Sequence, residues 1–588
     1  MTKPIDPITM QVINNFLVTT CREMGVAMMN TSYSPLFNEG LDFSCAIFDE
    51  KGEMIAQAEF CPAHLGAIIY IAEWTIQEVG LENFHPGDVI IHNDPFRGGC
   101  HIPEFCVIKP VFYQDKIVAY LCCIGHMTEV GGMVPGGFAG DAIEVFQEGI
   151  RLPPVKIVEG GKDRDDIWNI ILSNVRTPRY AYGDVKAMIG SLYVGEKRVL
   201  ELIDRYNLET YLEMKEAIKD YSERRMREEI RAMPDGLYTY EGYAIDNDGV
   251  IDAPLKLKVT VIIEGDEMIV DYTGSAKQAR GPVNCTYGVT ASGTYNALLH
   301  LTDKDIPSII AGCYRPVTII GSAGHDCEDI EYPGGASVGG NSGFTRTWLW
   351  RFTPPCRMPC PTAFRPLTAA PRTPGSGGIH PDTGEMFANL SNEGCGWGGR
   401  ATKDGNDALC IPNGNCAIAP IEVLEGRYPI LHREFSLNEG SGGAGQNRGG
   451  LGYTREIELL SEEMRVSSFI ERNVIEPEGF FGGRPGRRSA FLVKVGERNR
   501  YQTMKEAFST KCNGKFSDIH MLKGDVIRLV TSGGGGYGDP FQRDFERIER
   551  DVAEGYISRQ QAEQDYRVVL REDGTVDREA TARLREGV

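Results

Sequence analysis

At 588 residues the sequence is too long for one compact core, and its length predicts about three or four lobes. With 61 Lys and Arg against 82 Asp and Glu, the formal net charge of −21 disfavours nucleic acid and anionic membranes as partners. Sixteen scattered cysteines without paired CxxC motifs favour reduced thiols over disulfides, and the lack of a signal peptide or an eighteen-residue apolar run predicts a cytoplasmic protein with no membrane segment.

The chain is predicted to begin with a helix, because Asp6 is suited to cap it and Pro7 fits its first turn. One face of this helix, which we expect to be buried, carries four apolar residues: Ile8, Val12, Phe16 and Leu17. From about 41 to 150, short β-like runs alternate with Gly and Pro turns, and the turn from Asp49 to Gly52 predicts a hairpin.

Residues 195–232 combine helical periodicity with dense charge, which predicts a solvated helical pair between lobes. Next, LKLKVTVII and EMIVDYTG alternate apolar and polar residues like antiparallel strands, and beyond 330 glycine dominates. The predicted fold class is α+β, with β-rich lobes of antiparallel hairpins and peripheral helices. The expected units are 1–194, a helical linker 195–234, a β-containing lobe 235–330, a Gly-rich α+β lobe 331–545 and a charged helical tail 546–588.

The segment from about 346 to 373 differs from the rest of the chain. It has many prolines, no acidic residue and neither helical nor strand periodicity. Codons exist for FTPPCRMPCPTAFR that, read two nucleotides on, encode YTALSHAMPDRV, which would form an ordinary amphipathic helix. Two interpretations stay open here: a frameshifted patch and a genuine Pro-rich loop. Resequencing the gene separates them.

A candidate metal site lies around HNDPFRGGCHIPEF, residues 92–105. The β-like runs EFCVIKPVFY and KIVAYLCCIGHM flank Gln114 and Asp115, a hairpin pattern. With the turn centred near position 115, paired positions sum to about 230, which places Glu104 opposite His126 and brings His101 near Glu129. Two imidazoles with one or two carboxylates suit a divalent cation such as Zn, Mn or Fe(II).

Three further side chains are candidates for the same cleft. They are His64 in CPAHLGA as a substrate-binding residue, Asp42 as a further carboxylate, and Asp94 at a strand end, where functional groups are commonly presented. The alternative interpretation is structural, since strand-end histidines commonly make surface hydrogen bonds and an Asp before a β run is commonly a turn residue. Clustering in the sequence alone does not separate the two.

The glycine-rich stretches invite a phosphate-binding interpretation, because successive backbone amides bind anions. The sequence contains no GxxxxGK[ST] string, no GxSxG motif and no convincing dinucleotide-binding pattern, so tight turns are the favoured role. Arg448, inside the stretch 440–450, is the candidate for holding a carboxylate or phosphate of a substrate.

Nine ordered motifs carry a resemblance over residues 5 to 570: NEGLDFSCAIFD, HNDPFRGGCHIPEF, IGHMTEVGG, FQEGIRLPPVKI, GPVNCTYGVT, GGIHPDTGEMFANL, DGNDAL, GSGGAGQNRGGLG and GGGGYGDPFQRD. Together they resemble the hydantoinase B and oxoprolinase family, which includes the large subunits of acetone and acetophenone carboxylases. The resemblance implies a hetero-oligomer in which a hydantoinase A-type, ATP-binding subunit phosphorylates a small-molecule substrate and the B-type subunit completes the reaction with a divalent metal.

Carried over by position, the HxxD metal motif of this family falls on His101 and Glu104, and its later ligand falls on His126. Glu104 departs from the usual Asp, and its longer side chain affects the geometry and the preferred metal. Asp42 and Asp94 match further acidic positions as ligands or supporting residues. The family has an Asp where this chain has Gly440, so this loop lacks a carboxylate here. The family also has an ordinary helix across 346–372, and this second difference favours the frameshift interpretation.

Three functions follow as hypotheses. The first is an ATP-dependent amidohydrolase that opens a cyclic amide such as a hydantoin, 5-oxoproline or a lactam, with Glu129 or Asp94 as general base. The second is a subunit of a ketone carboxylase, which a bicarbonate requirement would distinguish. The third is a non-catalytic scaffold subunit whose metal is structural or absent.

Overall fold

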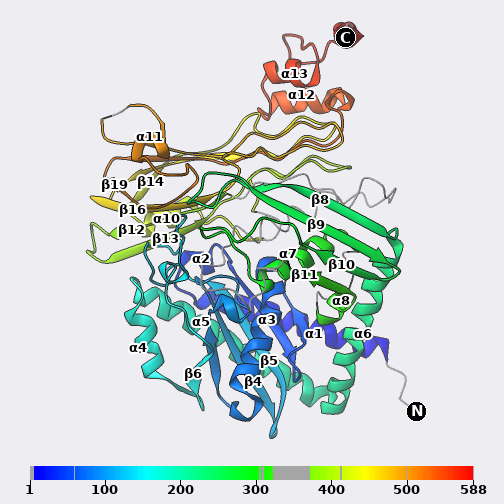
Figure 1. Ribbon diagram of the computed structural model, residues 1–588, viewed down its shortest axis with the longest axis vertical. Coiled ribbons are helices and arrows are strands. Elements are labelled where there is room, and N and C mark those ends of the chain that lie inside the picture. The colour runs from blue at the N-terminus through cyan, green and yellow to red at the C-terminus, as the bar shows by residue number, and fades with distance from the viewer. Residues whose placement is uncertain are drawn as a thin grey trace.

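The structure is a computed structural model, and it describes residues 6–58, 60–303, 306, 310–321, 371–410, 414–497 and 499–586. Figure 1 shows an N-terminal α/β lobe, a separate sheet of strands β8 to β11, a β-sandwich above them and a group of small helices at the C-terminus. Of the segment interpreted as frameshifted, 346–370 lies outside the described residues, and 371–373 begins strand β12.

The N-terminal lobe contains a seven-stranded antiparallel sheet in the order β2-β1-β5-β4-β3-β6-β7. Its strands are β1 (Phe43–Asp49), β2 (Met54–Gln57), β3 (Val89–His92), β4 (Glu104–Tyr113), β5 (Lys116–His126), β6 (Val155–Glu159) and β7 (Lys162–Asp163). The predicted hairpin turn after Asp49 is confirmed, since Gly52 N–H donates to the Asp49 carbonyl and β1 pairs with β2.

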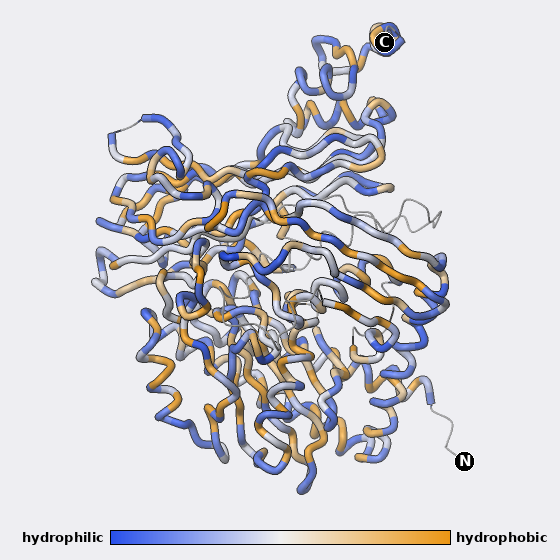
Figure 2. Tube along the Cα trace, viewed as in Figure 1, coloured by the Kyte–Doolittle hydropathy of each residue, from blue (hydrophilic) through white to orange (hydrophobic). Residues whose placement is uncertain are grey.

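Helices cover both faces of this sheet. Along β1, Cys45 and Ile47 face a core shared with α1 (Pro7–Thr31) and α5 (Pro178–Tyr206), whereas Ala46 and Phe48 face a core shared with α3 (Pro62–Val79) and α7 (Tyr287–Leu299). All seven residues of β1 are therefore buried, which explains why five of the seven, in FSCAIFD, are apolar and do not alternate with polar residues. In Figure 2 hydrophobic segments concentrate inside this lobe.

Helix α1 begins as predicted, with the Asp6 carboxylate accepting from the backbone N–H groups of Ile8 and Thr9. The predicted buried face is wrong in its first turns. The exposed fraction of Ile8 is 74% and that of Val12 is 44%, because the helix packs on the sheet along a neighbouring stripe. That stripe consists of Ile13, Leu17, Cys21, Met24 and Met28.

The helical pair expected over 195–232 is longer than predicted and belongs to the N-terminal lobe. Helix α5 ends at Tyr206, and α6 (Leu208–Ala232) follows after Asn207, whose φ is 64°. The expected boundary between 194 and 195 lies inside α5, whose buried residues join the core of the seven-stranded sheet. The smaller elements of this lobe are α2 (Pro35–Asn38), α4 (Asp165–Ser173) and the 3-10 helices η1 (Leu81–Asn83), η2 (Pro95–Arg97) and η3 (Val145–Gln147).

The second sheet has the order β11-β10-β9-β8, and the predicted antiparallel pair is confirmed as β9 with β10. Strand β11 is parallel to β10. The sheet shares a core with α3, α7 and the end of α6, so it is joined to the N-terminal lobe by apolar packing. The bounds are β8 (Gly236–Ile245), β9 (Leu255–Glu264), β10 (Glu267–Asp271), β11 (Val317–Ile320) and α8 (Ala311–Tyr314).

Two further sheets, β13-β12-β16-β19 and β14-β15-β20-β17-β18, pack face to face around one apolar core. The strands are β12 (Pro371–Ile379), β13 (Met386–Asn392), β14 (Ile430–Leu437), β15 (Tyr453–Leu459), β16 (Glu463–Ile470), β17 (Ala490–Lys494), β18 (Gln502–Thr503), β19 (Lys515–Leu522) and β20 (Val526–Val530). Helices α10 (Ile421–Arg427) and α11 (Met504–Phe508) cover this core at its edges.

The glycine-rich stretches pack against one another. Gly443 N–H donates to the Gly534 carbonyl, and Gly449 N–H donates to the Gly443 carbonyl. A Cβ atom on Gly449 would lie 1.9 Å from the Gly534 oxygen, so glycine is required here for close approach of backbones more than for turns.

The chain ends in η4 (Pro540–Gln542), α12 (Phe545–Ala553), α13 (Arg559–Tyr566) and α14 (Arg578–Glu586). Among the described residues no helix is both long enough and apolar enough to cross a membrane. The cysteines in the described ranges are free thiols.

Candidate metal centre

The hairpin of β4 and β5 brings the predicted metal ligands together. Its turn lies at Gln114 and Asp115, and Glu104 is directly opposite His126, as the pairing arithmetic predicts. His101 lies in the turn before β4, where its carbonyl accepts from the Glu104 N–H at 3.1 Å. Strand β4 therefore begins, and strand β5 ends, at the same open end of the hairpin.

The side chains meet around the Glu104 carboxylate. Glu104 Oε1 lies 3.0 Å from His101 Nδ1 and 2.9 Å from His64 Nε2, and His64 Nε2 lies 3.6 Å from Asp42 Oδ1. The rings of His101 and His126 make an edge contact with centroids 4.8 Å apart. All five side chains are buried, so the structure brings together Asp42, His64, His101, Glu104 and His126.

The charges of the cluster are coupled. Burial alone would raise the pKa of Glu104, but the charges of His101 and His64 and their hydrogen bonds hold it well below its usual range. Burial lowers the pKa of His126 to about 4, and the positive charge of His101 adds to this effect. Burial also opposes the charge of His64, but the negative charges of Cys61 and Glu104 raise its pKa well above the ordinary value.

Three polar atoms of the cluster have no hydrogen-bond partner among the described residues: Glu104 Oε2, His101 Nε2 and His126 Nε2. A buried polar atom left in this state costs about 1–3 kcal/mol, so three in one cluster make it a candidate ligand site. His126 Nδ1 lies 3.0 Å from the Met127 carbonyl, which assigns the proton to Nδ1 and the lone pair to Nε2. Two imidazoles and a carboxylate fit a divalent cation of the Zn, Mn or Fe class.

Sequence reasoning missed the aromatic side chains at the centre. The ring of Phe138 lies 5.2 Å from His126 and 6.0 Å from His101, and on its other side 6.3 Å from Phe469 of β16. Phe469 belongs to the sandwich, so the centre lies where that lobe meets the N-terminal lobe. No local signal in the sequence joins these segments, which are more than 300 positions apart.

Two cysteines were also missed. Burial raises the pKa of Cys61, but its hydrogen bond with Cys416 and the charge of His64 outweigh that effect and lower it to about 6. Cys61 precedes α3, and Cys416 lies in the loop before α10. Asp42 connects the same regions, since its Oδ2 accepts from Asn392 Nδ2 at 3.1 Å.

The other predicted site residues have different partners in the structure. The carboxylate of Glu129 accepts from Gly131 N–H at 2.7 Å and forms an ion pair with Arg176 at 2.8 Å. Asp94 caps η2 through Phe96 N–H and pairs with Arg97.

Arg448 also has partners outside the cluster. Its Nη1 donates to the Gly449 carbonyl at 2.7 Å and lies 3.5 Å from Asp407, while its guanidinium stacks 4.9 Å over the ring of Tyr556. These contacts place Arg448 among the glycine-rich loops and the C-terminal region.

The fold and the cluster define a multilobed α+β protein with a buried centre of histidines and carboxylates at the junction of two lobes. The chain belongs to the Hydantoinase B/oxoprolinase family, which it matches over residues 6–540.

Two relatives cover nearly the whole chain. The beta subunit of caprolactamase from Pseudomonas jessenii is 33% identical over 595 residues, which is 98% of each chain. A protein of Pseudomonas sp. (strain NS671), named as the B-type subunit of a "Putative D-/L-hydantoinase", is 30% identical over 99% of this chain and 98% of its own.

Two solved structures have the same fold. The crystal structure of the ATP-dependent caprolactamase from Pseudomonas jessenii matches 99% of this chain and 100% of its own with a TM-score of 0.87 at 30% identity. Nucleotide-free acetone carboxylase matches 99% of this chain and 83% of its own with a TM-score of 0.85 at 18% identity. This likeness shows a shared fold only.

Proposed function

We propose that this chain is the B-type subunit of an ATP-dependent amidohydrolase that opens a cyclic amide, such as a hydantoin, 5-oxoproline or a lactam. Membership of the family supports the reaction class, and relatives named as the B-type part of a hydantoinase and the beta subunit of a caprolactamase support a second subunit. In this proposal a hydantoinase A-type partner binds ATP and phosphorylates the amide oxygen of the small-molecule substrate, which activates the amide carbon for attack by water. The ring C–N bond then breaks, the nitrogen takes up a proton, and hydrolysis of the resulting acyl phosphate releases phosphate.

The observation that carries the proposal is the set of buried atoms on Glu104, His101 and His126 that have no hydrogen-bond partner within the described ranges. With Asp42 as a further carboxylate, these residues would hold the divalent cation. When bound, such an ion supplies Lewis-acid chemistry and lowers the pKa of water.

The protein's own groups prepare this centre. The Met127 carbonyl holds the His126 ring with its Nε2 lone pair turned to the cluster, and the low pKa of Glu104 keeps that carboxylate ionised. His64 Nε2 lies 2.9 Å from Glu104 Oε1, so this contact holds the ring beside the centre, where His64 is proposed to bind substrate. Phe138 and Phe469 restrict access of bulk water from the sandwich side.

The general base stays a prediction. Glu129 and Asp94 are both bonded to arginines, so either would have to leave its partner, Arg176 or Arg97, before it could accept a proton. A base role for Glu129 would show as a shifted pH profile in its Gln variant.

The test is to reconstitute the chain with an A-type subunit and to measure ADP and ring-opened product from hydantoin, 5-oxoproline and caprolactam, with and without dialysis against a chelator. We expect ATP-coupled ring opening of one of these substrates, lost on chelation and restored by one of Mn, Zn or Fe(II). A complex that forms and binds metal yet opens none of the rings contradicts the proposal.

A ketone carboxylase subunit is the second candidate, and the likeness to acetone carboxylase favours it at the level of the fold. A strict bicarbonate requirement with acetone or acetophenone as substrate would identify it. The third, a scaffold subunit, predicts that ligand variants keep full turnover in the complex, and loss of turnover in an intact complex excludes it.

A further inference from the structure

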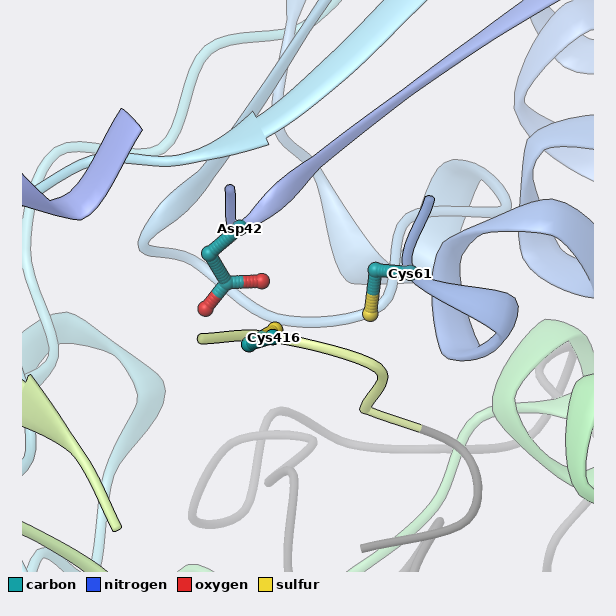
Figure 3. A group of neighbouring side chains, drawn as sticks. All are labelled: Asp42, Cys61 and Cys416. Atoms are coloured by element: carbon teal, nitrogen blue, oxygen red, sulfur yellow. The ribbon is translucent and has the colours of Figure 1, made fainter. Parts of the chain in front are cut away.

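A second group of potential ligands lies beside the histidine cluster. Asp42, Cys61 and Cys416 come from three different segments, and their side chains turn toward one another in Figure 3. One oxygen of Asp42 and the two sulfur atoms all lie within 4.8 Å of each other. Asp42 and Cys61 are buried and Cys416 is half-buried, so the group is largely shielded from solvent.

The backbone around these side chains is held firmly. Ala417 N–H donates to the Gly40 carbonyl at 2.9 Å, and Asn415 Nδ2 donates to the Phe60 carbonyl at 2.9 Å, so the Cys416 loop is fastened on both sides to the segments that carry Asp42 and Cys61. Cys61 N–H donates to Ser44 Oγ at 3.1 Å. Three ligands on mutually bonded segments are preorganised, which lowers the cost of binding an ion.

The chemistry of the ligands is selective. Thiolates prefer soft or borderline cations, and a mixed sulfur, oxygen and nitrogen set is typical of zinc. In a tetrahedral zinc site the bond lengths of 2.0–2.3 Å separate ligand atoms by about 3.3–3.8 Å, which is compatible with three atoms that lie within 4.8 Å of one another. His64 lies beside these ligands, because it hydrogen bonds with Cys61 and its Nε2 lies 3.6 Å from Asp42 Oδ1, and a water molecule can take the fourth position.

We propose that Asp42, Cys61 and Cys416 bind a zinc-class cation at a second site, separate from the centre of His101, Glu104 and His126. Asp42 lies between the two sets and can ligate both ions through its two oxygens. Because Cys416 precedes the sandwich strands while Asp42 and Cys61 belong to the N-terminal lobe, the ion would clamp the two lobes together. The inference depends on the thiols of this chain and stands independently of the proposed reaction.

The experiment uses the full chain purified with a non-thiol reductant, stripped of metal and reloaded with Zn²⁺ or Co²⁺. The variants are Cys416→Ser and Cys61→Ser at the new site, His126→Ala at the histidine centre, and Cys285→Ser as a control for a buried thiol elsewhere. Metal per chain is measured by mass spectrometry, and cobalt–thiolate ligation by its charge-transfer absorption.

We expect about two ions per parent chain and a thiolate absorption band. Cys416→Ser should lose one ion and the band, His126→Ala should lose the other ion and keep the band, and Cys285→Ser should match the parent. If Cys61→Ser fails to fold, the Cys416→Ser variant alone tests the thiol site, because Cys416 is half-buried.

The inference is overturned if the parent chain shows no cobalt–thiolate band, or if the Cys416→Ser variant keeps both ions. It is also overturned if the parent chain binds a single ion that Cys416→Ser and His126→Ala both lose. These results differ from failure of the proposed function. An active complex without the band overturns only the thiol site, and a band in a complex that opens no ring overturns only the proposed reaction.

Discussion

Two clusters of charged groups in the N-terminal lobe, the buried histidine centre and a partly buried acidic cluster, differ in whether they contain their own cation. Asp49, Glu53 and Glu216 have oxygen atoms within 4.8 Å of one another, as a metal site requires. Lys219 lies among them, 2.7 Å from Asp49 Oδ2 and 3.2 Å from Glu216, and Lys215 is 3.5 Å from Asp49. At the histidine centre the corresponding atoms, Glu104 Oε2 and the Nε2 atoms, face no such ammonium group among the described residues.

The difference shows that converging carboxylates alone do not define a metal site. In the acidic cluster the lysines satisfy the carboxylates, so the cluster stabilises the fold and has no need of an ion. In the histidine centre unsatisfied polar atoms persist at a cost, and this cost is the basis for proposing a bound ligand there. Substitution should therefore affect catalysis in one cluster and stability in the other.

The largest expected effect is that of His126→Ala. Lewis-acid stabilisation is worth several kcal/mol, and about 4 kcal/mol corresponds to a loss of turnover of about a thousandfold. Turnover of the reconstituted complex and metal content should fall together, while the melting temperature changes little. The exposed His520→Ala is the matched control. Retention of metal and turnover by His126→Ala would contradict the assignment of this residue.

Lys219→Met should have the opposite profile. It leaves Asp49, which is fully buried, beside only the more distant Lys215, and removal of one partner from a buried pair costs about 3 kcal/mol or more. Chemical denaturation should show this loss, with unchanged metal content. Lys197, whose side chain is 76% exposed, gives the control variant Lys197→Met, which should change stability by less than about 0.5 kcal/mol. Loss of metal from Lys219→Met would abolish the distinction between the clusters.

Glu129→Gln is expected to have an effect intermediate between the loss of turnover in His126→Ala and the loss of stability in Lys219→Met. Its carboxylate holds Gly131 N–H and Arg176, so the variant should lose about 1–2 kcal/mol of stability, measured by denaturation together with Arg176→Gln in a double-mutant cycle. The exposed Glu462→Gln is the control. A loss of turnover comparable to that of His126→Ala, with stability unchanged, would instead support the base role.

The smallest effect concerns pH. Burial opposes the charge of Glu216, but hydrogen bonds from Lys51 and Lys219 lower its pKa to about 2. Since the folded-state pKa lies below the ordinary value of about 4.5, the stabilisation is present above pH 4.5 and is lost as pH falls toward 2. The difference in melting temperature between the parent and Glu216→Gln should shrink over that window and in high salt. A difference that is independent of pH would show that the charge of Glu216 is not involved.

Much of the site was predictable because hairpin pairing is local. The turn residues Gln114 and Asp115 determine the register that places Glu104 opposite His126, so simple counting finds two of the proposed ligands. The cap at Asp6 and the strands β9 and β10 were predictable for the same reason, since their signals lie within a few residues.

Tertiary structure decided the rest. Ile8 and Val12 have the spacing of core residues but remain exposed, because packing of whole elements selects which face of α1 is buried. The contacts of Phe138 with Phe469 and of Cys61 with Cys416 join segments more than 300 residues apart, and no local pattern specifies them. The sequence by itself determined which side chains can act as ligands and which of them pair within the hairpin. The docking of the sandwich on the N-terminal lobe decided which distant side chains meet, because burial and long-range contact depend on the whole fold.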